Sequence, residues 1–132
     1  MDENRSIGKL YIVATPIGNS KDMSPRGRQI LADADMIAAE DTRVSVKLLN
    51  HFGIKKELCS YFEHNRREKG EYLINEMKNG KNIALVSDAG TPAISDPGED
   101  LVRLCAEHGV DVVPVPGAVA GINALISSGL ST

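Results

Sequence analysis

The feature that most constrains the fold is a regular alternation of short apolar segments with segments of helical periodicity. Apolar segments typical of strands span residues 9–14, 36–39, 57–62, 82–87 and 110–115. Helical patterns span residues 25–34, 44–52, 66–78, 99–108 and 118–128. Because strands that alternate with helices form right-handed βαβ units, we predict an α/β fold: a Rossmann-like, mainly parallel five-stranded sheet with helices on both faces.

Several helix ends carry recognisable signals. Ser24 before Pro25 predicts an N-cap followed by proline at the first helical position. Asn65 is predicted to cap the charged helix that follows it, and Gly53 is predicted to end the helix before it. The apolar strands at 9–14, 82–87 and 110–115 are predicted to be buried on both faces, as parallel strands usually are.

Length and composition indicate one globular domain. The chain has 132 residues, of which 42% are hydrophobic and 25% charged, and we assign residues 1–8 to a tail and 9–132 to the domain. The net charge of −3 excludes a generic polycation that coats nucleic acid, but it allows an enzyme with a local basic surface for RNA. With no membrane-spanning run and no signal-peptide pattern, we expect a cytoplasmic protein that does not bind membranes. Cys59 and Cys105 are interpreted as small buried apolar residues.

The unusual residues lie directly after the predicted strands. They occupy positions 15–19, 40–43, 63–65, 88–98 and 114–118. Turns explain the glycines and prolines there, but they explain Asp88, Asp96 and the sequence Glu40-Asp41-Thr42-Arg43 poorly. Because open parallel sheets bind ligands at the carboxyl ends of their strands, we expect a small-molecule or cofactor site at this edge.

Common ligand motifs are absent from the sequence. It contains neither a phosphate-binding Gly-x-x-x-x-Gly-Lys-Ser/Thr nor a Gly-x-Gly-x-x-Gly dinucleotide motif. No cluster of histidine and cysteine has zinc-ligand spacing, so we expect no metal, and no serine lies in a Gly-x-Ser-x-Gly elbow. The residues alone therefore leave the ligand unidentified.

Four segments together resemble the tetrapyrrole methylase family. They are Leu10 to Asn19, Ala39 to Arg43, Val86 to Pro92 with Ser95 to Gly98, and Val115 to Ala118. The sequence is most similar to the branch that methylates small-subunit ribosomal RNA. Corrin-type members have a glycine-rich first loop, whereas this chain has Thr15-Pro16-Ile17-Gly18-Asn19, which favours the RNA branch over tetrapyrrole substrates.

The resemblance implies an S-adenosylmethionine-dependent methyltransferase that acts on the ribose 2′-oxygen of a cytidine in 16S ribosomal RNA. It also implies a homodimer and a second α/β domain, so we expect this chain to be the N-terminal half of a longer enzyme and to bind the donor weakly or not at all alone. The residues that the resemblance assigns to the donor are Thr15, Pro16, Gly18, Asn19, Asp88, Ala89, Gly90, Thr91, Pro92, Ile94, Asp96, Pro116, Gly117 and Ala118.

The catalytic candidates are not distinguished by the sequence. A general base would accept the proton of the 2′-hydroxyl, and the carboxylates available are Asp88, Asp96, Glu40 and Asp41. A turn at Asp96-Pro97 and a helix cap at Glu40-Asp41 are alternative explanations. Arg43 suits a phosphate contact or the ordering of carboxylates.

His64, Arg66 and Arg67 are candidates for contact with the RNA, and a solvated helix face is the alternative for the two arginines. Two other functions remain open: a methyltransferase that acts on a tetrapyrrole or corrin, and a binding module without catalysis.

Overall fold

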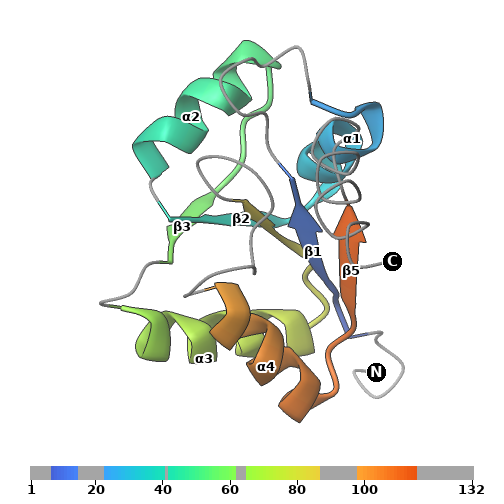
Figure 1. Ribbon diagram of the computed structural model, residues 1–132, viewed down its shortest axis with the longest axis vertical. Coiled ribbons are helices and arrows are strands. Elements are labelled where there is room, and N and C mark those ends of the chain that lie inside the picture. Colours follow the sequence, from blue (N-terminus) through green and yellow to red (C-terminus); the bar gives the residue numbers. More distant parts are fainter. Residues whose placement is uncertain (1–6, 15–22, 41, 62–64, 87–97, 116–132) are drawn as a thin grey trace, which may run out of the picture.

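The computed structural model describes residues 7–14, 23–40, 42–61, 65–86 and 98–115. Strands and helices alternate along this part of the chain, which confirms the predicted α/β class (Figure 1). The predicted helix at 118–128 lies outside the described residues. The elements in chain order are β1 (Leu10–Val13), α1 (Pro25–Asp33), β2 (Met36–Ala39), α2 (Thr42–His51), β3 (Leu58–Ser60), α3 (Arg66–Lys78), β4 (Ile83–Val86), α4 (Gly98–His108) and β5 (Val112–Val115).

The five strands form one parallel sheet in the order β3-β2-β4-β1-β5. The connections through α1 and α2 step toward the β3 edge, and those through α3 and α4 step back toward the β5 edge. Crossovers of one hand that step in opposite directions must place their helices on opposite faces. Figure 1 shows this arrangement, with α1 and α2 on one face and α3 and α4 on the other.

Each face of the sheet has its own apolar core, because successive side chains of a strand point to opposite faces. In β1, Leu10 and Ile12 belong to the cluster on the α3–α4 face, whereas Val13 belongs to the cluster on the α1–α2 face. The same alternation holds in β2 and β4, whose residues are all buried. The prediction of burial on both faces is therefore confirmed for β4 and, apart from half-buried Tyr11, for β1.

For β5 the same prediction is wrong. Val112 and Val113 are half-buried and Pro114 is exposed, because β5 is an edge strand and pairs only with β1. Proline lacks the N–H that a sheet ladder requires, and it is confined to such edges. Pro114 thus belongs to the edge of the sheet rather than to its centre.

Two of the predicted helix boundaries are confirmed in detail. The Ser24 hydroxyl accepts a hydrogen bond from the Gly27 N–H at 3.0 Å, and Pro25 begins α1. Gly53 has φ of 69°, a left-handed conformation that favours glycine, two residues after the end of α2.

The chain before β1 is held against the turn that joins α3 to β4. The Gly8 N–H donates to the Met77 carbonyl at 2.7 Å, and the Lys9 N–H donates to Asn82 Oδ1 at 3.0 Å. Gly8 is buried in this contact, so the packed structure begins at or before Gly8.

Candidate functional site

The carboxyl ends of the five strands are aligned along one edge of the sheet. The register pairs Val86 at the end of β4 with Val13 of β1 on one side and with Ala39 of β2 on the other. Val115 pairs with Val13, and Ser60 pairs with Ala39. We call this line of strand ends the carboxyl edge. The predicted segments 15–19, 40–43, 63–65 and 88–98 each follow one of these residues, whereas the segment 114–118 begins inside β5, which contains Pro114 and Val115.

The carboxyl edge contains points where the direction of the connections reverses. The chain leaves β1 and β2 for helices on one face, and it leaves β3 and β4 for helices on the other face. Neighbouring connections therefore diverge between β3 and β2, between β2 and β4, and between β4 and β1. Connections that diverge in this way open a crevice at the ends of the strands, and α/β proteins bind ligands there. Because β4 is the middle strand of the sheet, we take its end at Val86 as the centre of the candidate site.

Most of the predicted site residues lie outside the described part of the chain. They are Thr15, Pro16, Gly18, Asn19, Asp41, His64, Asp88, Ala89, Gly90, Thr91, Pro92, Ile94, Asp96, Pro116, Gly117 and Ala118.

The described candidates flank the β3 side of the carboxyl edge. Glu40 directly follows β2 and is exposed, and Arg43 is the second residue of α2 and is also exposed. Arg66 begins α3, and Arg67 follows it with an exposed side chain. These residues come from two neighbouring strand–helix connections, so the fold brings together two candidate groups that are about 23 residues apart in sequence.

Asn65 has a different role from the one predicted. It lies at the N-cap position of α3, but its side chain makes no capping hydrogen bond. Its amide Nδ2 instead donates to the Ser60 carbonyl at 3.0 Å. The bond reaches back to the last residue of β3, and it fixes the start of α3, with Arg66 and Arg67, beside the carboxyl edge.

The two cysteines are structural. Both are buried and neither is in a disulfide, as predicted. Burial raises the pKa of the Cys105 thiol to about 11, and it also raises the pKa of Cys59. A thiol with a raised pKa is a poor nucleophile, because only the thiolate attacks.

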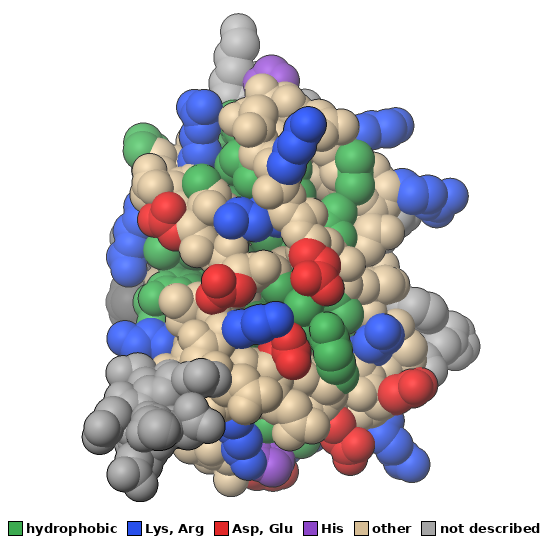
Figure 2. Space-filling model, turned by 180° about the vertical axis from the view of Figure 1, so that it is seen from behind, with side chains coloured by type: hydrophobic (Ala, Val, Ile, Leu, Met, Phe, Trp, Pro, Cys, Tyr) green, Lys and Arg blue, Asp and Glu red, His purple; other side chains and the backbone are tan. Residues whose placement is uncertain are grey.

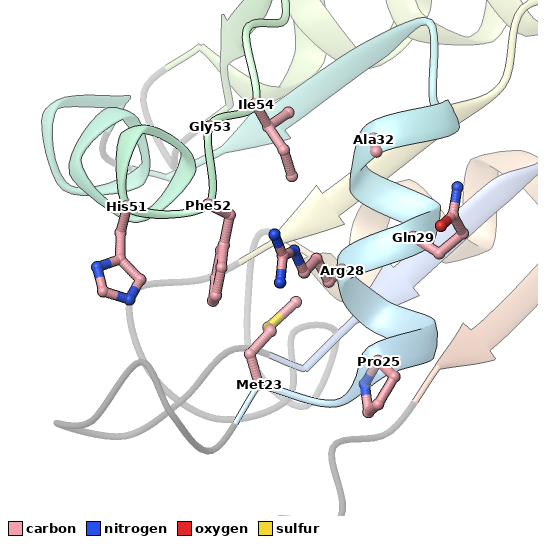
Figure 3. Close-up of a pocket in the computed structure, with 9 residues that line it drawn as sticks. All are labelled: Met23, Pro25, Arg28, Gln29, Ala32, His51, Phe52, Gly53 and Ile54. Atoms are coloured by element: carbon pink, nitrogen blue, oxygen red, sulfur yellow. The ribbon is translucent and has the colours of Figure 1, made fainter.

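Cavities lined by described residues lie on both helical faces of the sheet. One of about 750 Å³ is bordered by α1 and the end of α2 (Figure 3), and one of about 330 Å³ lies between α3 and α4. The first is lined by Met23, Pro25, Arg28, Gln29, Ala32, His51, Phe52, Gly53 and Ile54. No sequence pattern predicts this cavity. The sequence contains only an arginine in one helix and an aromatic residue directly after the following helix. It does not show that these two side chains are in contact.

The described residues hold no cluster of three or more histidine, cysteine or acidic side chains suited to a metal. Within the same ranges, no helix is long and apolar enough to cross a bilayer.

Comparison with known proteins gives many related sequences. Ribosomal RNA small subunit methyltransferase I of Synechocystis is 56% identical over 126 residues, which cover 96% of this chain and 45% of the relative. The protein of the same name from Haemophilus influenzae is 56% identical over 125 residues, covering 95% of this chain and 44% of the relative. The chain thus spans less than half the length of these relatives.

Solved structures show the same fold. A cobalt precorrin-4 methyltransferase, described as a cobalamin biosynthetic enzyme, superposes with a TM-score of 0.70 at 25% identity over 92% of this chain and 50% of that one. Uroporphyrin-III C-methyltransferase of Thermus thermophilus, complexed with S-adenyl homocysteine, has a TM-score of 0.61 at 22% identity over 83% of this chain and 45% of that one. The family profile of Tetrapyrrole (Corrin/Porphyrin) Methylases matches residues 9–132, and the chain therefore belongs to the tetrapyrrole methylase family.

Proposed function

We propose that this chain is the donor-binding domain of an S-adenosylmethionine-dependent methyltransferase that methylates the ribose 2′-oxygen of a cytidine in 16S ribosomal RNA. The observation that carries the proposal is the order of strands at the carboxyl edge, because it separates the candidate residues into two groups. Identity of 49–56% to relatives named ribosomal RNA small subunit methyltransferase I supports the RNA substrate.

The first group is the proposed donor side. The residues that the family resemblance assigns to the donor follow β1, β4 and β5, and these three strands are neighbours in the order β4-β1-β5. Gly90 and Gly117 in these segments would allow close approach of the main chain to the donor, and the prolines would restrict the shape of the loops. Segments that follow adjacent parallel strands can converge on one small ligand.

The second group is the proposed RNA side. Glu40, Asp41 and Arg43 follow β2, and His64, Arg66 and Arg67 follow β3, the next strand in the sheet. A positive side chain in the first turn of a helix interacts unfavourably with the helix dipole, at a cost of about 0.3–1 kcal/mol in stability. Helix α3 begins with two arginines, followed by Glu68, and α2 has Arg43 as its second residue, whereas Glu99 and Asp100 follow Gly98 in the first turn of α4. Unfavourable placement of arginine at two adjacent helix starts supports a role in phosphate binding.

The donor supplies an electrophilic methyl group on a sulfonium. The residues of this chain would hold the 2′-oxygen in line with that methyl group. A carboxylate from the segments that follow the strands would accept the hydroxyl proton, and the candidates are Asp88, Asp96, Glu40 and Asp41. Alignment provides much of the acceleration in such a transfer, and the base contributes about 10²–10⁴-fold.

The share of the relatives that this chain covers supports a longer protein with a second domain. We propose that this second domain completes the donor pocket, that the protein is cytoplasmic, and that it acts as a homodimer.

The test uses the purified complete protein that contains this chain. The protein is incubated with S-adenosylmethionine that carries a tritiated methyl group. We expect label in 16S ribosomal RNA of unmethylated small subunits and resistance of the labelled position to alkaline cleavage, since a 2′-O-methyl group blocks that reaction. Glu40→Gln should lower kcat if Glu40 is the base. Asp111→Asn, an exposed carboxylate before β5 at the other end of the sheet, is the matched control.

Transfer of label to uroporphyrinogen or a precorrin instead of RNA would contradict the RNA assignment. Absence of transfer to either substrate class would favour a binding module without catalysis.

A further inference from the structure

Charge is unevenly distributed between the two faces of the sheet. Residues 23–33 and 42–56, which form α1, α2 and the connection to β3, contain six cationic residues and one acidic residue. Helices α3 and α4 together contain five cationic and six acidic residues. Figure 2 shows basic side chains over both halves of the surface, whereas the acidic side chains lie mainly over the middle and the half that α3 and α4 form. The cationic residues of the first face are Arg26, Arg28, Arg43, Lys47, Lys55 and Lys56.

We call this surface the α1–α2 basic face. Its only acidic residue within these segments, Asp33, accepts two hydrogen bonds of 3.0 Å from the Gln29 amide. All the cationic side chains except half-buried Lys56 are exposed. Three exposed acidic residues, Asp35, Glu40 and Glu57, flank these segments at the ends of β2 and before β3, so the excess of positive charge belongs to α1, α2 and the connection that follows α2. A domain of net charge −3 therefore presents two helices whose exposed charges are mostly positive and attract anions.

The 750 Å³ cavity opens on this face, and its lining contains one arginine and two aromatic ring side chains. The Arg28 guanidinium lies over the Phe52 ring, 5.0 Å from its centroid, and the His51 ring meets Phe52 edge-on at 5.1 Å. Figure 3 shows Arg28 reaching from α1 toward Phe52, with Met23 and Ile54 beside them. An aromatic ring under a guanidinium holds its plane in place, and its N–H donors remain able to bind phosphate.

A second copy of this chain is a less suitable occupant. A symmetric dimer would bring the same surface of both copies together, and two basic faces would repel each other. An acidic, stacking ligand is complementary in both charge and ring chemistry, and single-stranded RNA has both properties.

The geometry points to the α1–α2 basic face as an RNA-binding surface, with the Arg28–Phe52 cavity receiving one unpaired nucleotide of the ribosomal RNA. This inference rests on the proposed function, and it extends the RNA contact from the starts of α2 and α3 along the α1–α2 face of the domain. Arg28 binds a backbone phosphate, and the bases or riboses contact Phe52, His51 and Met23.

The test measures binding of a fluorescent transcript of the small-subunit ribosomal RNA by the complete protein across a range of salt concentrations. Arg28→Gln should lower the slope of log K against log salt concentration by about 1, the value for one lost phosphate contact. Phe52→Leu should weaken binding by about tenfold with little change in slope, because stacking is lost while the charge remains. Lys78→Gln, an exposed cation at the end of α3, is the matched control and should change neither quantity.

The possible outcomes separate this inference from the proposed function. Wild-type protein that neither binds nor methylates ribosomal RNA contradicts the proposed function. If the wild-type protein binds and methylates ribosomal RNA, and both Arg28→Gln and Phe52→Leu behave like the wild type, the RNA-binding face is refuted while the proposed function stands. Altered sedimentation of Arg28→Gln with unchanged RNA binding assigns the face to contact between copies and also refutes the inference. Arg28 is exposed, so Arg28→Gln should fold even if Phe52→Leu does not.

Discussion

Substitution of Gly8 by alanine tests how tightly the start of the chain is built into the fold. A Cβ at this position would overlap the carbonyl carbon and oxygen of Lys81 and would lie 3.0 Å from the Lys81 nitrogen. All three atoms belong to the backbone, so no side chain can move aside. The Gly8 N–H also donates to the Met77 carbonyl at 2.7 Å, and separation of the two segments would break that bond.

The expected destabilisation follows from these contacts. Overpacking against a rigid neighbour costs about 1–3 kcal/mol, and loss of the hydrogen bond adds about 1 kcal/mol. Alanine also restricts the unfolded chain relative to glycine, which offsets the cost by about 0.4–1 kcal/mol. The net decrease in the free energy of unfolding is therefore about 2 kcal/mol.

Urea unfolding followed by circular dichroism measures this difference. Gly109→Ala is the control: Gly109 has φ of 73° and nothing within 4 Å of the added Cβ, so it reports backbone strain without overlap. Strain of that kind costs about 1 kcal/mol. If Gly8→Ala destabilises the protein less than Gly109→Ala does, the segment at Lys81 can move away freely and the reasoning is refuted.

Two further predictions concern the helix cap and the buried thiol. Ser24→Ala should lower the free energy of unfolding by about 1 kcal/mol, whereas Ser24→Thr, which keeps the hydroxyl, should cost much less; equal losses in urea unfolding would contradict a capping role. The folded-state pKa of Cys105 is raised to about 11 from an ordinary 9.0, so its contribution to stability is fully present below pH 9 and is lost as the pH rises to 11. The loss is about 2–3 kcal/mol, and it should be absent in Cys105→Ala; an identical pH dependence in both proteins would assign the effect to other groups.

The strands and helices could be predicted because their signals are local. Met36–Ala39 is predicted with its observed bounds, and Ser24, Pro25 and Gly53 act where their conformational preferences indicate. The errors arise from tertiary context. Val112 to Val115 has the composition of a central strand, and only its position in the sheet order makes it an edge. Asn65 has the right residue type for a cap, but its Nδ2 donates to the nearby Ser60 carbonyl and its side chain makes no capping hydrogen bond.

The candidate site was predictable in outline for a different reason. Parallel strands place their carboxyl ends together whatever their order, so residues after each strand could be assigned to one edge before the order was known. The division of that edge into a β4-β1-β5 part and a β3-β2 part required the order itself. No sequence pattern states that β4 lies between β1 and β2, because that placement depends on packing of the whole sheet.

The α1–α2 basic face shows how topology converts an ordinary net charge into a local field. Residues 26–56 contain six cationic and four acidic residues, whereas residues 68–132 contain four cationic and nine acidic residues. The connections reverse direction after β3, so helices before that point cover one face and helices after it cover the other. A separation of charge along the chain therefore becomes a separation between faces. Net charge averages over both faces and cannot reveal it, and substitutions that exchange charge between α1 and α3 should alter RNA affinity at constant net charge.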